Sequence, residues 1–181
     1  NSNFYSNFLN KISFSINKFI SPKFIINQIK RKNKKNNLSS RIIEDFNLKK
    51  LNPKIVNIDH HLSHLASTYH CSPFNEAISI SIDGFGDFCS LVISISKNNE
   101  FKILSKVLFP HSAGVFYQAF TQFLGFNNYG DEYKVMGLAG YGEPKYLDDI
   151  KKIIKLKNNG TFEIDNSYFE LTKGNFEYNW D

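Results

Sequence analysis

Three consecutive segments alternate apolar and small polar side chains, and this alternation constrains the fold more than any other feature of the chain. The segments span residues 77–82, 88–96 and 101–109. A period of two is typical of β-strands, because successive side chains of a strand point to opposite faces of the sheet. The polar segment 97–100 separates the second and third runs and predicts a tight turn. The sequence therefore predicts an antiparallel meander of three strands.

Helical patterns flank the predicted strands. Apolar residues recur at gaps of three and four over residues 4–20, which predicts an amphipathic helix. Further helices are predicted at 23–32, at 41–46 with Ser39 or Ser40 as cap, at 62–69, at 115–124 with Ser112 as cap, and at 146–154. Shorter runs predict a buried strand at 56–58 and a hairpin formed by 161–164 and 168–171. Together these elements predict an α/β fold that mixes helices with strands.

The chain has 181 residues, enough for one ordinary domain, and its 41% hydrophobic content supports a core. Its net charge of +5 is concentrated early, since Glu44 and Asp45 are the only acidic residues before residue 55. A basic segment of this kind can bind a phosphate-bearing partner or a membrane surface, but the favoured interpretation is a solvated helix face. We divide the chain into a basic helical segment (1–52), a core (53–144) and a helix with short strands (145–181).

The two cysteines, Cys71 and Cys89, provide no disulfide framework and form no Cys-x-x-Cys pair. We interpret both as reduced core residues of a cytoplasmic protein. No run approaches the roughly 18–20 apolar residues needed to span a bilayer. The first residues lack the charged and then apolar regions of a signal peptide. These features predict a cytoplasmic protein without a membrane partner.

Three of the five histidines, His60, His61 and His64, lie within five residues. His60 and His64 are four residues apart and share one face of a helix, which suits two imidazole ligands on one metal ion. His61 with His64 is a second possible pair. Asp83 ends a strand-like run and is the candidate carboxylate ligand, although a turn aspartate can also cap its own backbone.

Gly84 and Gly86 form a Gly-x-Gly turn between two predicted strands. Glycine lets backbone N–H groups approach a phosphate closely, yet most such turns are only hairpins. The pattern does not match the dinucleotide-binding or P-loop motifs, which need a helix after the loop.

The Gly-rich stretch 125–142 contains the third group of candidate residues. Its carboxylates can accept hydrogen bonds from ribose hydroxyls, and its lysine can pair with a phosphate. The alternative is a structured connecting loop, but long ordered loops in compact domains tend to be functional. Before this stretch, a capping role for Ser112 is preferred to a catalytic role for His111.

Six motifs occur in order between residues 56 and 144. They are His-His-Leu-Ser-His at 60–64, Ser-Pro-Phe-x-Glu-Ala at 72–77, Ile-Asp-Gly-x-Gly at 82–86, Phe-Pro-His-Ser at 109–112, Phe-x-x-x-Leu-Gly-Phe at 120–126 and Gly-Asp-Glu-Tyr-Lys-Val-Met-Gly-Leu-Ala at 130–139. This series resembles the NodU/CmcH-type O-carbamoyltransferases and covers half of the chain.

The resemblance implies a partial actin-like, sugar-kinase-like domain, in which helices flank a mixed sheet. It also implies a bound divalent metal, iron(II). It implies the metal ligands His60, His64 and Asp83, with a further aspartate from later in such enzymes. The nucleotide site would be lined by Gly84, Gly86, Gly130, Asp131, Glu132, Lys134 and Gly137. Such enzymes use ATP and carbamoyl phosphate to make carbamoyl-adenylate in a separate C-terminal domain. The carbamoyl group then passes to a hydroxyl of a small-molecule acceptor.

The sequence predicts no particular catalytic residue. We expect the C-terminal adenylate-forming domain to be absent from this chain, which would then be inactive by itself. Two alternatives remain. One is threonylcarbamoyl-type transfer to tRNA, although nucleic acid is not the expected partner. The other is an inactive nucleotide-binding remnant or one subunit of a split enzyme.

Overall fold

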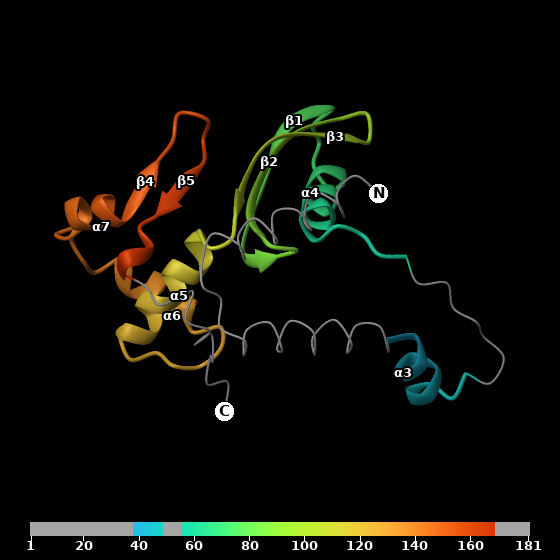
Figure 1. The fold of residues 1–181 in the computed structure, drawn as a ribbon, viewed down its shortest axis with the longest axis horizontal. Helices are drawn as coiled ribbons and strands as arrows, with labels where there is room; N and C mark the ends of the chain where they lie inside the picture. The colour runs from blue at the N-terminus through green and yellow to red at the C-terminus, as the bar shows by residue number, and fades with distance from the viewer. Residues whose placement is uncertain (1–37, 49–55, 169–181) are drawn as a thin grey trace.

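The computed structural model describes residues 38–48 and 56–168 (Figure 1). The predicted helices at 4–20 and 23–32 and most of the run 168–171 lie outside these residues. In the described part, the elements in chain order are α3 (Leu38–Asp45), α4 (His60–His70), β1 (Glu76–Gly86), β2 (Cys89–Lys97), β3 (Glu100–Leu108), α5 (Ala113–Phe123), α6 (Glu132–Ala139), α7 (Leu147–Ile153), β4 (Ile154–Leu156), β5 (Phe162–Ile164) and a 3₁₀ helix (Asn166–Tyr168). The mixed α/β class predicted from the sequence is confirmed. The predicted mixed sheet is wrong for the described residues, because every strand pair there is antiparallel.

The three-stranded sheet has the order β1-β2-β3, and both neighbouring pairs are antiparallel, so the predicted meander is confirmed. The β2–β3 turn is formed by Asn98 and Asn99, whose φ angles are 49° and 63°. Two residues with positive φ are typical of the type I′ turn, whose twist matches that of the two strands it joins.

The β1–β2 turn lies further along the chain than the sequence predicts. β1 continues through Gly84 and Gly86, with an irregular register between Ile82 and Gly86. The turn residues are Asp87 and Phe88, with φ angles of 50° and 70°. The expected Gly-x-Gly turn is therefore wrong, because these glycines end a bulged strand instead of reversing the chain.

Helix α4 packs against the sheet on a face formed by serines (Figure 1). Ser79, Ser81, Ser94 and Ser96 are all buried. Small side chains let the helix backbone approach the strands, and burial is tolerated because these hydroxyls are hydrogen-bonded. Ser96 Oγ, for example, donates to Ser79 Oγ over 2.7 Å.

The hydrophobic core is centred on Leu65 of α4 and on Cys89 and Val92 of β2. Phe101 and Leu108 of β3 pack against this cluster. These residues attach the helix to the middle of the sheet, so the first turn of α4 lies beside the end of β1.

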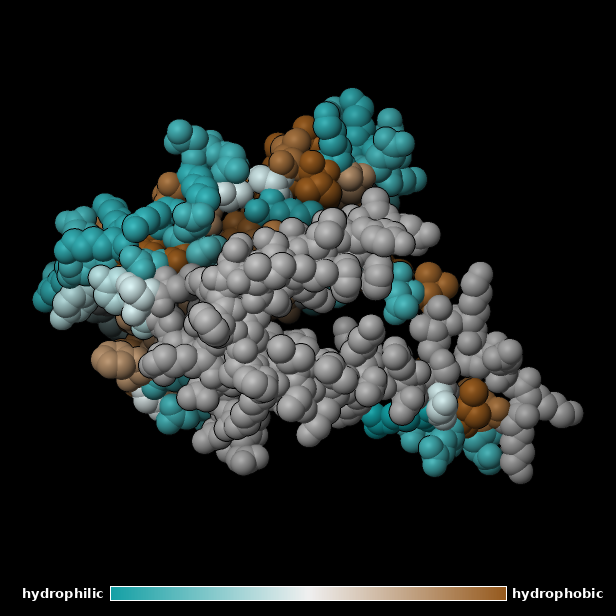
Figure 2. Space-filling view, viewed as in Figure 1, coloured by the Kyte–Doolittle hydropathy of each residue, from teal (hydrophilic) through white to brown (hydrophobic). Residues whose placement is uncertain are grey.

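The opposite face of β1 is open. Ile78, Ile80 and Ile82 are 62%, 55% and 61% exposed. Figure 2 shows hydrophobic surface above the sheet. On β2, the half-buried Ile93 is covered by the loop between β4 and β5, since a Cβ added at Gly160 would lie 3.3 Å from its Cδ1 atom. The three isoleucines of β1 are more exposed than Ile103 of β3, which is 41% exposed, and β1 pairs with one strand only among the described residues.

Helix α5 follows the sheet, and its N-terminus is joined to the end of β1. Ser112 caps the helix as predicted, since its Oγ accepts the Val115 N–H over 3.1 Å. The same hydroxyl lies 2.6 Å from the carbonyl oxygen of Gly84, to which it donates. A Cβ added at Gly114 would lie 2.9 Å from the backbone nitrogen of Gly84, so this close approach requires glycine.

Several sequence predictions are corrected. The Gly-rich stretch 125–142 contains helix α6, with Gly137 inside it, and is not only a loop. Strand β5 pairs with β4 instead of with 168–171, because the turn between β4 and β5 brings these two nearest segments together. Residues 56–58 form no strand, and Val56 and Ile58 are exposed, because no described strand pairs with them.

The helix predicted at 41–46 begins earlier, at Leu38, so Ser39 and Ser40 lie inside α3 and not at the position before its first turn. Helix α7 agrees with the predicted 146–154 to within one residue at each end. Within the described residues, we find no helix with the length and apolar character that a membrane crossing requires.

Candidate metal centre

The first turn of α4 presents two histidines toward the end of β1. Asp59 is the N-cap, and its Oδ1 accepts the Leu62 N–H over 3.0 Å, as short polar side chains do at this position. The helix therefore starts at His60, two residues earlier than the sequence predicts. One helical turn then places His64 on the same face as His60.

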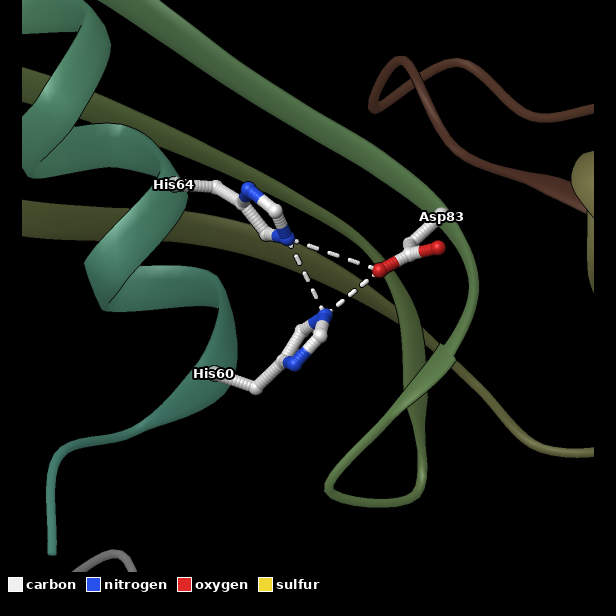
Figure 3. A group of neighbouring side chains, drawn as sticks. All are labelled: His60, His64 and Asp83. Carbon is white, nitrogen blue, oxygen red and sulfur yellow. Dashed lines mark hydrogen bonds and ion pairs between the residues drawn. The ribbon is translucent and has the colours of Figure 1, made fainter.

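Asp83 lies near the end of β1, beside the two histidines. It lies two residues after Ser81, so alternation along the strand puts it on the face that α4 covers. Figure 3 shows His60, His64 and Asp83 pointing toward one another. Asp83 Oδ2 lies 2.5 Å from His60 Nε2 and 3.5 Å from His64 Nε2, and the two nitrogens are 3.1 Å apart. The structure thus brings together all three side chains that the sequence analysis selected as metal ligands.

The Asp83 carboxylate is held by hydrogen bonds on both oxygens. Its Oδ1 accepts the Gly84 N–H over 2.7 Å, while Oδ2 faces the two imidazoles. Partial burial opposes ionisation, but the hydrogen bonds from His60 and Gly84 and the charges of His60 and His64 outweigh it. The pKa of the Asp83 carboxyl therefore lies below its usual value, and at neutral pH the group is an anion.

This arrangement fits a divalent cation. Two imidazole nitrogens face one carboxylate oxygen and each other, so their lone pairs need a shared proton or a cation between them. The three ligand atoms all lie within 4.8 Å of one another. Two histidines with one carboxylate form the donor set of open non-haem iron(II) sites, and the same donors also suit zinc. The side chains of His60, His64 and Asp83 are 38%, 54% and 36% exposed, so a substrate can reach them.

His61 is not part of this group. It is 2% exposed, and both ring nitrogens face the sheet. Nε2 lies 2.9 Å from the carbonyl oxygen of Cys89 and therefore donates, while Nδ1 lies 2.8 Å from Ser81 Oγ and accepts. His61 attaches α4 to β1 and β2, and the alternative pair of His61 with His64 is excluded in this arrangement.

An open pocket of about 520 Å³ begins beside Asp83. Its polar lining comes from β1, α5, the following loop and α6, and comprises Asp83, Tyr117, Gln118, Tyr129 and Glu132. Sequence reasoning missed Tyr117, Gln118 and Tyr129. The signal for Tyr117 and Gln118 was the presence of polar groups on the otherwise apolar predicted helix 115–124, whereas Tyr129 lies in the Gly-rich stretch 125–142.

Some of the residues predicted for the nucleotide site line the pocket beside Asp83. These residues are Gly84 and Glu132. Asp131 and Lys134 form an ion pair of 2.7 Å with each other, and Asp131 Oδ2 also accepts the Asn128 N–H.

Among the predicted glycines, Gly86 packs against His60, as described below. Gly130 and Gly137 are exposed and are not part of the pocket lining. Neither would meet another atom within 4 Å if a Cβ were added.

Comparisons with known proteins agree with the motifs. A family model described as the carbamoyltransferase N-terminus matches residues 3–178. An uncharacterized protein of Synechocystis sp. is 41% identical over 131 residues, which is 72% of this chain and 21% of that protein. Nodulation protein NolNO of Sinorhizobium fredii is 37% identical over 108 residues, covering 59% of this chain and 16% of the relative.

A further relative is nodulation protein NolO of Bradyrhizobium diazoefficiens, which is 34% identical over 110 residues, 59% of this chain and 20% of the relative. The chain spans about a fifth of the length of these curated relatives. The resemblance inferred from the six motifs is confirmed, and the family model extends it over nearly the whole chain. The chain belongs to the carbamoyltransferase family, matching the N-terminal part of its members.

Proposed function

We propose that this chain supplies the metal-binding and acceptor-side part of an ATP-dependent O-carbamoyltransferase. The reaction would move a carbamoyl group from carbamoyl phosphate, through carbamoyl-adenylate, to the hydroxyl of a small molecule. The observation that carries the proposal is the convergence of His60, His64 and Asp83 in a chain of this family. Because the chain spans about a fifth of its curated relatives, the complete reaction is proposed for the whole enzyme.

His60, His64 and Asp83 would hold iron(II). When bound, the ion would supply Lewis acidity, which polarises a carbonyl or lowers the pKa of a coordinated hydroxyl. The protein prepares the site by fixing one carboxylate as an anion through Gly84 and by presenting two imidazoles from one helical turn. Partial exposure of all three side chains leaves room for a substrate oxygen.

The pocket beside Asp83 supports the substrate half of the proposal. It shares Asp83 with the candidate metal centre, so a molecule bound there reaches the same carboxylate. Glu132 can accept hydrogen bonds from hydroxyl groups, Gln118 can donate and accept, and Tyr117 and Tyr129 offer aromatic faces. We propose that this pocket holds carbamoyl-adenylate or the acceptor next to the metal.

Metal binding by the purified chain tests the proposal. We expect about one iron or cobalt ion per chain under anaerobic conditions, and loss of that ion in His60→Ala/His64→Ala and in Asp83→Ala. His70→Ala is the matched control, because His70 is exposed and ends the same helix. Elemental analysis and titration with Co²⁺ measure the stoichiometry. Absence of binding by the wild-type chain, or equal loss in His70→Ala, would contradict the proposal.

A further inference from the structure

The turn between β1 and β2 contacts the candidate metal ligand His60 in two ways. We propose that Gly86, the last residue of β1, and Asp87, the first residue of the turn after it, position the His60 imidazole. Gly86 provides the space for the ring, and Asp87 holds the backbone of the same residue. The functional part of this inference rests on the proposed metal centre, while the positioning itself is a property of the metal-free fold.

Gly86 is buried, and the His60 imidazole occupies the space where a Cβ of this residue would lie. A Cβ added at Gly86 would lie 2.5 Å from His60 Nε2, and closer still to Cγ and Cδ2. The ring cannot slide past such a group, because atoms at these separations overlap. Any side chain at this position would therefore push the imidazole away from Asp83.

Asp87 binds the backbone of His60. Its Oδ2 accepts the His60 backbone N–H over 3.0 Å, although the two residues are 27 positions apart in sequence. His60 is the first residue of α4, and the first N–H groups of a helix have no acceptor within it. A carboxylate at this point also interacts favourably with the helix dipole.

The backbone of Asp87 suits this role. Its φ of 50° lies in the left-handed region, which aspartate tolerates better than most residues. The type I′ turn fixes Asp87 relative to Gly86, which pairs with Cys89 across the turn. The same short segment therefore fixes the ring and the amide of His60 together, and aims Nε2 at Asp83 and His64. Groups that orient ligands in this way typically change metal affinity by roughly 10–100-fold when mutated.

The test compares Gly86→Ala, Asp87→Ala and Asp87→Asn with the wild-type full chain. Gly140→Ala is the glycine control, because an added Cβ there meets only the Gly137 carbonyl oxygen, at 3.8 Å. The Co²⁺ dissociation constant and the visible spectrum of the bound ion are measured, and circular dichroism checks folding. We expect Gly86→Ala and Asp87→Ala to weaken binding roughly 10–100-fold and to alter the spectrum. Asp87→Asn keeps an acceptor oxygen and should restore wild-type binding, as should Gly140→Ala.

A second measurement needs no metal. Nuclear Overhauser contacts between the Gly86 Hα protons and the His60 ring, and slow exchange of the His60 amide, are expected in the wild type and in Asp87→Asn. Asp87→Ala should lose the slow exchange. If these signals are absent in the wild type, the positioning proposal is wrong, whether or not metal binds.

The two proposals fail separately. If the wild-type chain binds Co²⁺ through His60 and His64 but Gly86→Ala binds it equally well, the positioning role is overturned and the metal centre stands. If Asp87→Asn weakens binding as much as Asp87→Ala, then the charge of Asp87, and not its hydrogen bond to His60, is what matters, and its assigned role is wrong. If no variant binds metal but the Overhauser contacts are present, the positioning stands and the proposed function fails.

Discussion

At the residue scale, the two cysteines have opposite environments. Cys89 is 4% exposed, and its Sγ lies 3.2 Å from the carbonyl oxygens of Leu91 and Val107. Burial raises the pKa of the Cys89 thiol, so little of the reactive thiolate forms at neutral pH. Cys71 is exposed.

This contrast predicts that one of the two thiols reacts in the folded chain. With Ellman's reagent at pH 7.5, we expect rapid release of one equivalent of thionitrobenzoate, and two equivalents in guanidinium chloride. Cys71→Ser should abolish the rapid phase, whereas Cys89→Ser should keep it. Rapid reaction of two thiols in the native wild type would show that Cys89 is accessible.

Asp131 gives a prediction for pH dependence. The hydrogen bond from Lys134, aided by the Asn128 N–H, holds the pKa of the nearly buried Asp131 carboxyl below its usual value. A carboxyl with a lowered pKa stabilises the fold above its unfolded-state pKa of about 3.9, and this contribution is lost as the pH falls through the folded-state value. The stability of the wild-type chain should therefore fall below about pH 4.

Thermal unfolding followed by circular dichroism between pH 7 and pH 3 measures this effect. Asp131→Asn cannot take up the proton, so its melting temperature should be lower at pH 7 and should fall less steeply below pH 4. Lys134→Met removes the partner and should flatten the curve in the same way. Three parallel curves would show that this pair does not contribute to acid unfolding.

The sequence was sufficient to predict the three candidate metal ligands, but not the residues that surround them. His60 and His64 follow from helical spacing, and Asp83 from its place at the end of an alternating run. The role of Asp87 could not be predicted, because it depends on the exact position of the turn relative to α4. Tyr117 and Tyr129 line the pocket only because α5 and the following loop fold back beside β1, which no local pattern encodes.

At the scale of elements, the attachment of α4 to the sheet depends on His61. Truncation to alanine leaves Ser81 Oγ and the Cys89 carbonyl without their buried partner and opens a cavity. We expect His61→Ala to reduce the free energy of unfolding by about 2–4 kcal/mol. His61→Gln retains a donor and an acceptor and should recover part of the free energy of unfolding that His61→Ala loses. Urea unfolding measures the difference, with the exposed His70→Ala as control. A loss below about 0.5 kcal/mol in His61→Ala, the range of ordinary surface substitutions, would contradict this anchoring role.

Elements with a strong period were predicted well and those defined by tertiary contacts were not. The three strands of the meander and helix α7 agree with their patterns, because alternation and helical spacing are local properties. Helix α6 was missed because it lies within the glycine-rich stretch 125–142, whose composition resembles a loop. Residues 56–58 have apolar side chains suitable for a strand, but a strand needs a hydrogen-bonded neighbour, and the sequence does not show whether one exists.

At the scale of the whole molecule, the sheet has two unequal faces. One holds the buried serines and α4, and the other exposes isoleucines along β1. The alternating pattern is the same whether the serine face or the isoleucine face is covered, so the sequence predicts the strand but not which face is buried. The serine face is buried because Leu65, His61 and Tyr69 of α4 supply the apolar and polar contacts it needs.

Because one face of the sheet is buried and the other is exposed, substitutions on the two faces should change the free energy of unfolding by different amounts. Ile78→Thr/Ile80→Thr keeps β-branched side chains on an exposed strand and should change the free energy of unfolding by less than about 0.5 kcal/mol per site. Val92→Thr buries a hydroxyl at a position that is 2% exposed and should cost about 1–3 kcal/mol. Urea unfolding measures both.

The same isoleucines should make the folded chain bind hydrophobic probes. We expect the fluorescence of added anilinonaphthalene sulfonate to fall in Ile78→Thr/Ile80→Thr, because these substitutions remove exposed apolar surface from β1. Association at high concentration, followed by light scattering, should fall as well, since an edge strand with an apolar face is a site of self-association. A loss of stability in this variant as large as that of Val92→Thr, with no change in dye binding, would mean that the isoleucines are covered in solution and that the open face of β1 is not a surface of the folded chain.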